Sequence, residues 1–558
     1  MKSSMKFLGR GTFGEVYQHH DKAIKICKLF KETTNNDETE LEHTIIDNVL
    51  REAIFYSYIE GADIQQQTNS SYFNATSFLF YPPPPSSIPR AKVSLDENNQ
   101  IQFCMEYLGQ PLSKVRLQGK KHIFTVVYDI MNALVWLHER KWSHGDIKPS
   151  NILVHSPAQK DEKEIKGYLV DYGSLLFTSY IKPAYQRCTI YYVSPEEIKK
   201  YEATTASDIW SLGAVLFEMI TQQVFILSLM EYMKIPSENI QRFRKQCSHG
   251  AVHDPQFSTK QFLRQFFNKV MYSHILSFLQ ATFRDRDYLN ILSQCFVLDA
   301  SHRVSATFLL ELIHVILQLT NADTNKAQSI HETTLTIDKM IQMCEVTQVN
   351  MLTYDEICHA GVTSEERKMI VEKCVEICTS KSDISDEVFC HSLMLYDRFI
   401  FRKMGVGSTF DLEINRNIFH AVGLVVCCFL SGMILKETSI SVEQLATFLQ
   451  FSPSVSPTFI KQFILDLIRL FEFKILNITP DMIFRLFNNE YALEKKYVQK
   501  IVYEATLYPW LQSNILNIYK NIYGSNLLVA TKVAPTKKME TSNDSNESKL
   551  TQDASSKQ

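Results

Sequence analysis

Eight consecutive residues, His144 to Asn151 in the line HGDIKPSN, carry three side chains whose chemistries complement one another. Asp146 can accept a proton, and Lys148 can bind a phosphate group. Asn151 offers an amide oxygen to a metal ion, and Mg²⁺ is a hard cation that prefers oxygen ligands. The line therefore combines a proton acceptor, a phosphate-binding cation and a metal ligand.

Residues on both sides of this line extend the same chemistry. Lys25 follows Ala23 and Ile24 in a period-two pattern that predicts a strand, and it supplies a second cation. Asp171 follows the apolar run 167–170, which places its carboxylate at a strand end as a second metal ligand. A glycine-rich hairpin near the start can approach phosphates closely, because glycine has no Cβ. Its pattern consists of Gly9, Gly11, Gly14 and Val16.

Together these motifs resemble the signature of a eukaryotic protein kinase. A glycine-rich loop alone is a weak signal because such turns occur in many folds. Here the loop, Lys25, the line 144–151, Asp171 and the triplet 194–196 follow one another in the order of that family. The resemblance implies an α+β bilobal kinase fold over residues 1–320, with ATP and Mg²⁺ as cofactors and proteins as substrates.

The resemblance also implies a role for each polar residue. Asp146 would orient the substrate hydroxyl and accept its proton, Asn151 and Asp171 would hold magnesium, and Lys25 would bind the α and β phosphates. Lys148 would reach the transferred phosphate. A lysine at this place is typical of serine/threonine kinases, and Thr189, seven residues before Glu196, matches the threonine that braces the aspartate and the lysine.

Lys25 needs a carboxylate on a helix to orient it. Glu52 is the preferred candidate, because apolar residues recur at helical spacing around it. Glu40 and Glu42 are rivals, but the stretch 31–43 is polar and lacks periodicity, which favours a loop. The resemblance places the adenine between Val16 and Ala23 on one side and Leu153 on the other. The hinge that follows the upper sheet would comprise Met105, Glu106, Tyr107 and Leu108.

Departures from the family pattern bear on regulation. Gly145 replaces the arginine that in many kinases pairs with a phosphate on the activation segment, so we expect no dependence on that switch. Tyr172 and Ser194 replace Phe and Ala, which leaves the catalytic polar groups intact. Glu196 and Arg303 match the buried ion pair that ties this segment to the lower lobe.

Composition favours a globular protein with reduced thiols. The 558 residues are 45% hydrophobic and 21% charged, with a net charge of -3 that argues against a nucleic-acid partner. The 12 cysteines form no C-x-x-C pair, so neither a zinc site nor a disulfide framework is predicted, and we expect a cytoplasmic or nuclear protein. The glycine loop starts by residue 9, which leaves no room for a signal peptide. The uncharged run 421–435 is shorter than the ~20 residues of a membrane span, so a buried helix is expected.

The remaining segments divide by composition. Residues 65–90 are rich in Asn, Ser and Pro and predict a surface insertion, either a passive loop or a docking site for a proline-binding partner. Residues 321–345 predict a linker, and residues 523–558 a disordered tail.

Residues 346–522 have helical periodicity and resemble a single cyclin box. The stretches 366–377, 393–399, 421–435 and 459–475 look like its first, second, central and fifth helices. In cyclins an arginine of the first helix pairs with an aspartate of the second, so the resemblance implies that Arg367 pairs with Asp397. An unrelated helical bundle is the alternative interpretation.

Cyclins contact kinases through a lysine and a glutamate, at positions that align here with Met433 and Ile464, so that ionic contact is missing. The fusion nevertheless implies a kinase regulated in cis, by an intramolecular contact that assembles Lys25 and Glu52, with a role in the cell cycle. The alternative is a weakly active or inactive scaffold whose helical domain recruits a partner kinase or substrates.

Overall fold

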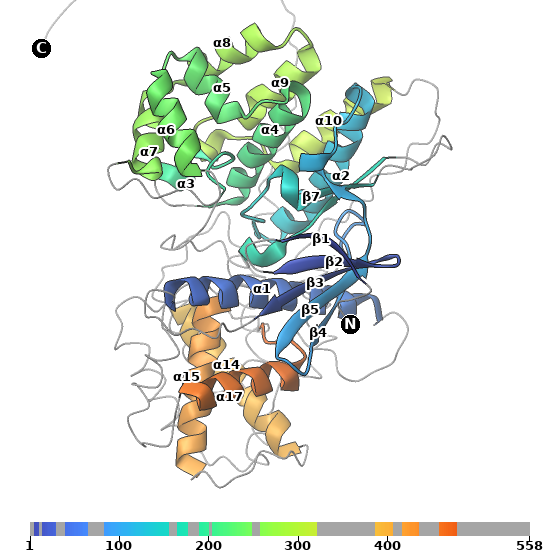
Figure 1. The fold of residues 1–558 in the computed structure, drawn as a ribbon, viewed down its shortest axis with the longest axis vertical. Helices are drawn as coiled ribbons and strands as arrows, with labels where there is room; N and C mark the ends of the chain where they lie inside the picture. Colours follow the sequence, from blue (N-terminus) through green and yellow to red (C-terminus); the bar gives the residue numbers. More distant parts are fainter. Residues whose placement is uncertain are drawn as a thin grey trace, which may run out of the picture.

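The computed structural model shows two lobes and a further group of helices (Figure 1). It describes residues 5–10, 14–28, 39–64, 83–155, 165–176, 189–199, 203–247, 257–320, 386–405, 416–434 and 457–476. The linker 321–345, the tail 523–558 and Arg367 lie outside these residues, as does the first helix of the expected cyclin box.

The smaller lobe is a five-stranded antiparallel sheet with one long helix. Its strands lie in the order β1-β2-β3-β5-β4. They are β1 (Lys6–Arg10), β2 (Glu15–His19), β3 (Lys22–Lys28), β4 (Ala91–Leu95) and β5 (Gln100–Glu106). Helix α1 (Thr39–Ile64) packs on β4 and β5. The helix begins at Thr39, so the loop expected over 31–43 is wrong from that residue onward.

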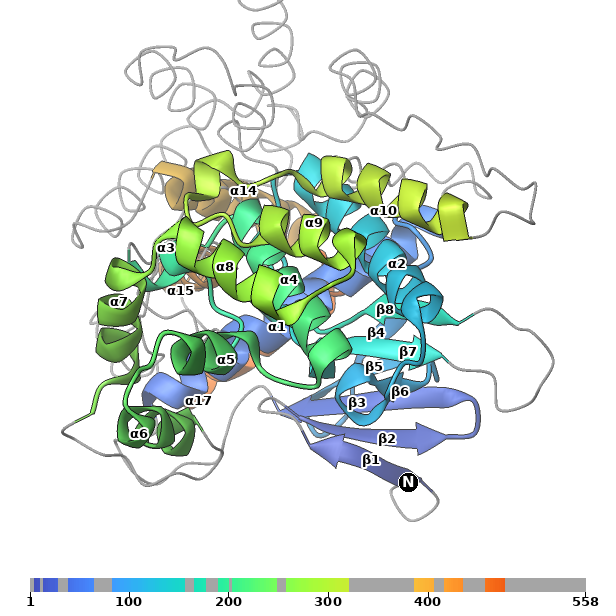
Figure 2. The ribbon, with the colours of Figure 1, turned by 90° about the horizontal axis from the view of Figure 1, so that it is seen from above.

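The larger lobe is helical, and seen from above the strands β1, β2 and β3 project beyond it (Figure 2). It contains α2 (Lys120–Glu139), α3 (Pro195–Lys199), α4 (Thr205–Thr221), α5 (Phe225–Tyr232), α6 (Ser237–Cys247), α7 (Thr259–Lys269), α8 (Tyr272–Thr282), α9 (Arg286–Cys295) and α10 (Ala306–Thr320). A small sheet of β6 (Gln110–Pro111), β7 (Ile152–His155) and β8 (Lys166–Leu169) faces the first lobe. The two-lobed arrangement expected for this part of the chain is confirmed.

Helix α4 forms the centre of the larger lobe. Its Trp210 is buried against Phe225, Phe267 and Phe296. Gly213 allows α4 to approach α9, because a Cβ at this position would lie 2.5 Å from the Cβ of Cys295. Close packing around Trp210 and Gly213 therefore fixes the position of α4 in this lobe.

The segment that follows α1 is not wholly a surface insertion. Ser87, Ile88 and Pro89 are buried, and the Ser87 carbonyl accepts a hydrogen bond from the Leu169 amide over 2.9 Å. The expected surface insertion is therefore wrong for residues 87–89, whose Ser87 joins the smaller lobe to strand β8, whereas Ser86 is exposed. Residues 65–82 lie outside the described part of the chain.

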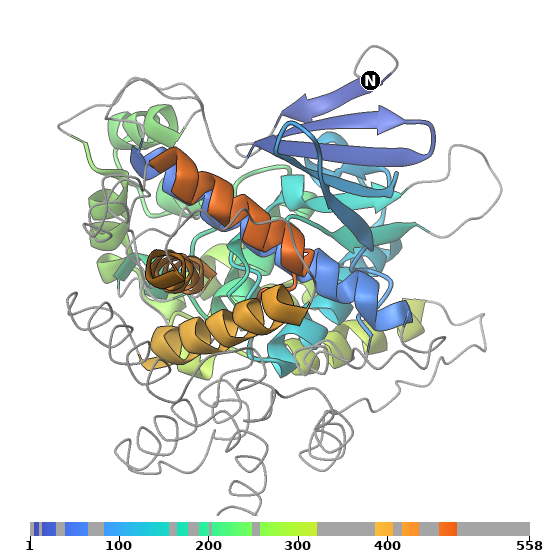
Figure 3. The same ribbon diagram turned by 90° about the horizontal axis from the view of Figure 1, so that it is seen from below.

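Three further helices lie on the side of α1 that faces away from the larger lobe (Figure 1). They are α14 (Asp386–Gly405), α15 (Arg416–Ile434) and α17 (Pro457–Phe471). Viewed from below, the orange-red helix α17 lies across α1 (Figure 3). Helix α15 starts before the expected Ala421, and α17 ends at Phe471 rather than at Ile475. Among the described helices, none is alone long and apolar enough to span a membrane, although the bent pair α4 and α5 passes that test by length and composition.

Candidate active site

Strand β3 positions the upper cation of the site. Lys25 lies opposite Val16 on β2 and Phe103 on β5, so it is held between two neighbouring strands. Its Nζ lies 2.6 Å from Glu52 Oε2 and 3.3 Å from Asp171 Oδ1. The structure thus brings together three predicted residues that are far apart in the sequence.

Helix α1 supplies Glu52, whose side chain is 3% exposed. Glu40 and Glu42 lie in the first turn of the same helix, ~15 Å or more from Glu52 along its axis at 1.5 Å per residue. Burial alone would lower the pKa of Lys25, but the carboxylates of Asp171 and Glu52 outweigh it and hold that pKa above its usual range. The Lys25 side chain is therefore a fixed positive charge.

Residues 144–151, the expected catalytic line, form a compact network around Asp146. Thr189 Oγ1 donates to Asp146 Oδ1 over 2.9 Å, and Lys148 Nζ lies 2.5 Å from Oδ2 and 3.2 Å from Thr189. The Asn151 amide nitrogen donates to the Asp146 carbonyl over 2.8 Å. Because its nitrogen is used in this way, the Asn151 amide oxygen is directed elsewhere, as a metal ligand requires.

Asp208 is a positioning residue that the sequence motifs did not assign. It lies buried at the start of α4, where its carboxylate accepts hydrogen bonds from the backbone amides of His144 (2.8 Å) and Gly145 (3.0 Å). His138 Nε2 lies 2.9 Å from the same carboxylate. A charged residue directly before the largely apolar run 209–217 was the available signal, because buried carboxylates are generally paired.

Gly145 has φ of 77°, in the left-handed region that glycine occupies without steric cost. Asp171 shares this region with φ of 69°, which costs energy for a residue with a Cβ. Burial would raise the pKa of Asp171, but Lys25 and Lys148 lower it below its usual value. Asp171 is therefore an ionised carboxylate at neutral pH, and its backbone is held in the left-handed conformation.

The residue after Asp171 anchors this segment in the core. Tyr172 is buried, its ring stacks on Phe55 of α1 with centroids 4.0 Å apart, and its hydroxyl donates to the Leu169 carbonyl over 3.0 Å. The hydroxyl that distinguishes this residue from Phe is thus satisfied. The segment 171–173 lies between the catalytic line and α1.

Asn151 and Asp171 fit a hard divalent cation. They offer one amide oxygen and one ionised carboxylate, and both belong to segments joined by the hydrogen bond from the Val170 amide to the Asn151 carbonyl, 3.0 Å long. Oxygen ligands of this kind suit Mg²⁺, which takes few protein ligands and binds phosphate oxygens as well. The donor set supports the metal role predicted for these two residues.

The residues proposed to contact the nucleotide frame the same region. Val16 and Ala23 lie on β2 and β3, with Ala23 paired to Met105, while Glu106 ends β5 and Leu108 follows it. Leu153 lies on β7. These residues come from both lobes.

The glycines of the hairpin differ in their surroundings. A Cβ at Gly9 would meet nothing within 4 Å, whereas one at Gly14 would lie 2.4 Å from the Ile26 carbonyl oxygen. The structure thus explains Gly14 by close packing on β3, in addition to the predicted approach to phosphates. Gly11 lies outside the described residues.

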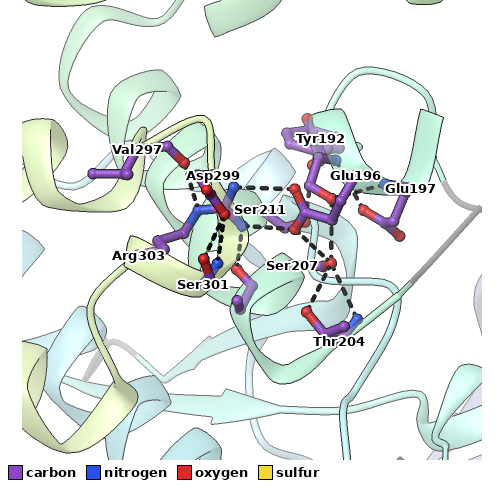
Figure 4. Close-up of polar contacts among 12 residues, drawn as sticks. Tyr192, Glu196, Glu197, Thr204, Ser207, Ser211, Val297, Asp299, Ser301 and Arg303 are labelled. Carbon is purple, nitrogen blue, oxygen red and sulfur yellow. Dashed lines mark hydrogen bonds and ion pairs between the residues drawn. The ribbon is translucent and has the colours of Figure 1, made fainter. Parts of the chain in front are cut away.

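The predicted buried pair of Glu196 and Arg303 is confirmed (Figure 4). Arg303 donates to both Glu196 oxygens over 2.7 and 3.1 Å, and Ser207 donates to the same carboxylate over 2.8 Å. Two parallel bonds of this kind fix geometry as well as charge. The pair ties the segment that contains Thr189 to the helical lobe.

Comparison with known proteins agrees with this site. The family model described as the protein kinase domain matches residues 3–315. An Aurora kinase of Saccharomyces cerevisiae is 30% identical over 227 residues, which is 39% of this chain and 52% of that protein. The MAP kinase kinase skh1/pek1 of Schizosaccharomyces pombe is 35% identical over 131 residues, 22% of this chain and 34% of that protein.

A third similar protein is the inhibitor of nuclear factor kappa-B kinase subunit beta of Rattus norvegicus. It is 26% identical over 227 residues, which cover 38% of this chain and 26% of that protein. The chain thus spans between about a quarter and half of the length of these relatives.

Proposed function

Because the chain belongs to the eukaryotic protein kinase family, we propose that it transfers the γ-phosphate of ATP to serine and threonine hydroxyls of proteins, with Mg²⁺ as the metal. The observation that supports this best is the joint presence of two networks, Lys25 with Glu52 and Asp171, and Asp146 with Lys148, Asn151 and Thr189. Phosphoryl transfer depends mainly on positioning and on electrostatic stabilisation, which these networks provide.

Each residue of the two networks has its own role in the proposed phosphate transfer. Asp146 accepts the proton of the substrate hydroxyl, and Thr189 and Asn151 fix the carboxylate for that task. Lys148 stands beside the same carboxylate and stabilises negative charge on the transferred group. Lys25 orients the nucleotide phosphates, and Glu52 holds Lys25 in place. Asn151 and Asp171 would hold magnesium, which would supply positive charge beside the phosphates.

We further propose that the C-terminal helices regulate this activity in cis, as a cyclin-like domain would. Every side chain from Asn48 to Ile59 of α1 is buried. A helix on the surface of a lobe keeps one face in water, whereas a helix buried all round has partners on every side. Here the second partner is the C-terminal group of helices, since α15 packs directly on α1.

Hydrogen bonds accompany this packing. Tyr58 of α1 donates to the Leu476 carbonyl over 2.8 Å, and Arg51 donates to the Met433 carbonyl over 3.1 Å. Met433 and Ile464, which stand where cyclins place a charged pair, are both buried. Among the described residues, the contact proposed here therefore uses apolar packing and hydrogen bonds to backbone carbonyls in place of the charged pair of cyclins.

A phosphorylation assay tests the catalytic proposal. The full chain is incubated with radiolabelled ATP, Mg²⁺ and a set of protein substrates, and the labelled amino acids are then identified. Label on serine and threonine supports the proposal, and label on tyrosine alone contradicts it. Asp171→Asn is the matched control, and turnover that survives in this variant contradicts the site assignment. A wild-type chain that binds ATP without turnover supports the scaffold alternative.

The cis contact is tested by comparing residues 1–320 with the full chain. We expect the shorter chain to lose most activity, because α1 is left with an uncovered apolar face. Equal activity of a folded 1–320 fragment contradicts cis activation. If the fragment does not fold, full-length variants that disturb packing between α14 and α15 decide the question.

A further inference from the structure

Arg51 lies next to Glu52 on α1 and is among the most buried charged side chains of the described residues, with 1% of its surface exposed. Successive residues of a helix point about 100° apart, so Arg51 and Glu52 face different neighbours. Glu52 faces Lys25, while Arg51 reaches two segments that belong to different parts of the chain. The sequence motifs gave Arg51 no role.

One guanidinium joins both of these segments. Arg51 Nη1 donates to the Gly173 carbonyl over 2.7 Å, and Nη2 donates to the Met433 carbonyl over 3.1 Å. The guanidinium is planar and its donors stand in a fixed fork, so the position of one carbonyl constrains the other. Gly173 follows the metal ligand Asp171 by two residues, and Met433 lies in the last turn of α15.

The end of α15 is suited to a buried cation. The last carbonyls of a helix have no donor within the helix, and the helix dipole gives this end a partial negative charge. With Arg51 at this end, the Met433 carbonyl gains a hydrogen-bond donor and the guanidinium gains an acceptor. Without Met433 in place, the guanidinium would lose a partner in an environment where unpaired charge is costly.

Gly173 is closely held by α1 through a second, independent contact. A Cβ on Gly173 would lie 3.1 Å from the Asn48 carbonyl oxygen, so the backbones of α1 and of the segment 172–174 are packed together. Movement of α1 at Asn48 and Arg51 therefore carries Gly173 with it. This links the docking of α15 to the conformation of Asp171.

We propose that Arg51 is a positioning residue that couples the docked end of α15 to the metal ligand Asp171. It touches neither substrate nor nucleotide. With Met433 in place, Arg51 holds the Gly173 carbonyl and thereby fixes the left-handed conformation of Asp171. The inference deepens the proposed regulation in cis and rests on it, since it states how the C-terminal helices reach the metal site.

The test uses the full chain and measures the binding of ADP at increasing Mg²⁺ concentration by calorimetry or thermal shift. We expect Arg51→Gln to weaken Mg²⁺-dependent ADP binding at least tenfold and to change metal-free ADP binding less than twofold. Arg51→Lys keeps the charge but lacks the fork, so an intermediate effect is expected. Ser57→Ala is the matched control, because Ser57 is also buried on α1 and its hydroxyl donates to the Ile54 carbonyl of the same helix over 2.8 Å.

Unchanged Mg²⁺ dependence in a folded Arg51→Gln variant overturns the inference. If this variant does not fold, Arg51→Lys decides in the same way. An equal loss in Ser57→Ala also overturns it, because it would show a general effect of loosening α1. The readout needs no phosphate transfer, so an inactive wild-type chain with Arg51-dependent binding would contradict the proposed function and leave this coupling intact.

Discussion

The ammonium of Lys25 lies 2.6 Å from the carboxylate of Glu52, on the helix that the C-terminal part of the chain also covers. One face of α1 thus presents Glu52 to the site, while other faces contact α15 and the Leu476 carbonyl. A change in the position of α1 would therefore alter the contact between Glu52 and Lys25. The four predictions below follow from this arrangement and from the packing around it.

Glu52→Gln removes the charge that orients Lys25 and keeps the size of the side chain. We expect phosphate transfer to fall on the order of 100-fold, because a preorganised electrostatic contact is lost. Steady-state kinetics with ATP as the varied substrate measure the loss. Glu40→Gln, in the first turn of the same helix, is the control. Equal losses in the two variants would mean that Glu52 acts through helix stability alone.

Asp208→Asn leaves an oxygen for only one of the two backbone amides, of His144 and Gly145, that the carboxylate now accepts. A buried hydrogen bond lost in this way costs about 1–3 kcal/mol, so we expect kcat to fall roughly 10- to 100-fold. KM for ATP should change little, because the nucleotide contacts come from other segments. A variant that loses ATP binding instead would contradict a role confined to the catalytic line.

Gly423→Leu probes the C-terminal helices at a distance from the site. A Cβ at Gly423 would already lie 3.0 Å from the Phe399 ring, so a larger side chain must force α15 away from α14. Overpacking of this kind costs about 1–3 kcal/mol. We expect a lower melting temperature together with lower kinase activity. Full activity in a chain whose α14 and α15 have loosened would argue against control by these helices.

We expect His391 to make the C-terminal helices less stable in acid. It is fully buried between α14 and α15 beside Ser431, and burial lowers its pKa to about 3. A depressed pKa gives stability that is present above the unfolded pKa of about 6.5 and is lost as pH falls toward the folded value.

At ~1.4 kcal/mol per pH unit, protonation of His391 in the unfolded chain should lower the free energy of unfolding by about 2 kcal/mol between pH 6.5 and pH 5. Chemical denaturation at both pH values measures the change. His391→Gln, which has no titrating ring, should show a smaller drop in unfolding free energy over this interval. The same drop in both proteins would exclude His391 as the cause.

The sequence by itself was enough to predict the candidate catalytic residues, because phosphate chemistry demands particular side chains at fixed local spacings. The line 144–151 and the order of Lys25, Asp171 and Glu196 are of this kind. Glu52 could be preferred over its rivals from helical periodicity, which is also a local property.

Only the tertiary structure decided what depends on contacts between distant segments. Asp208 on α4 accepts a hydrogen bond from the backbone amide of His144. Arg51 donates to the carbonyls of both Gly173 and Met433, and Met433 lies 382 residues after Arg51 in the sequence. A side chain that forms hydrogen bonds with backbone amides or carbonyls gives no sequence motif for the contact, because almost any residue can supply those backbone groups. The burial of α1 on all sides likewise depends on helices that lie far along the chain. The sequence therefore predicted a second group of helices but not the bonds by which Arg51 joins it to Gly173.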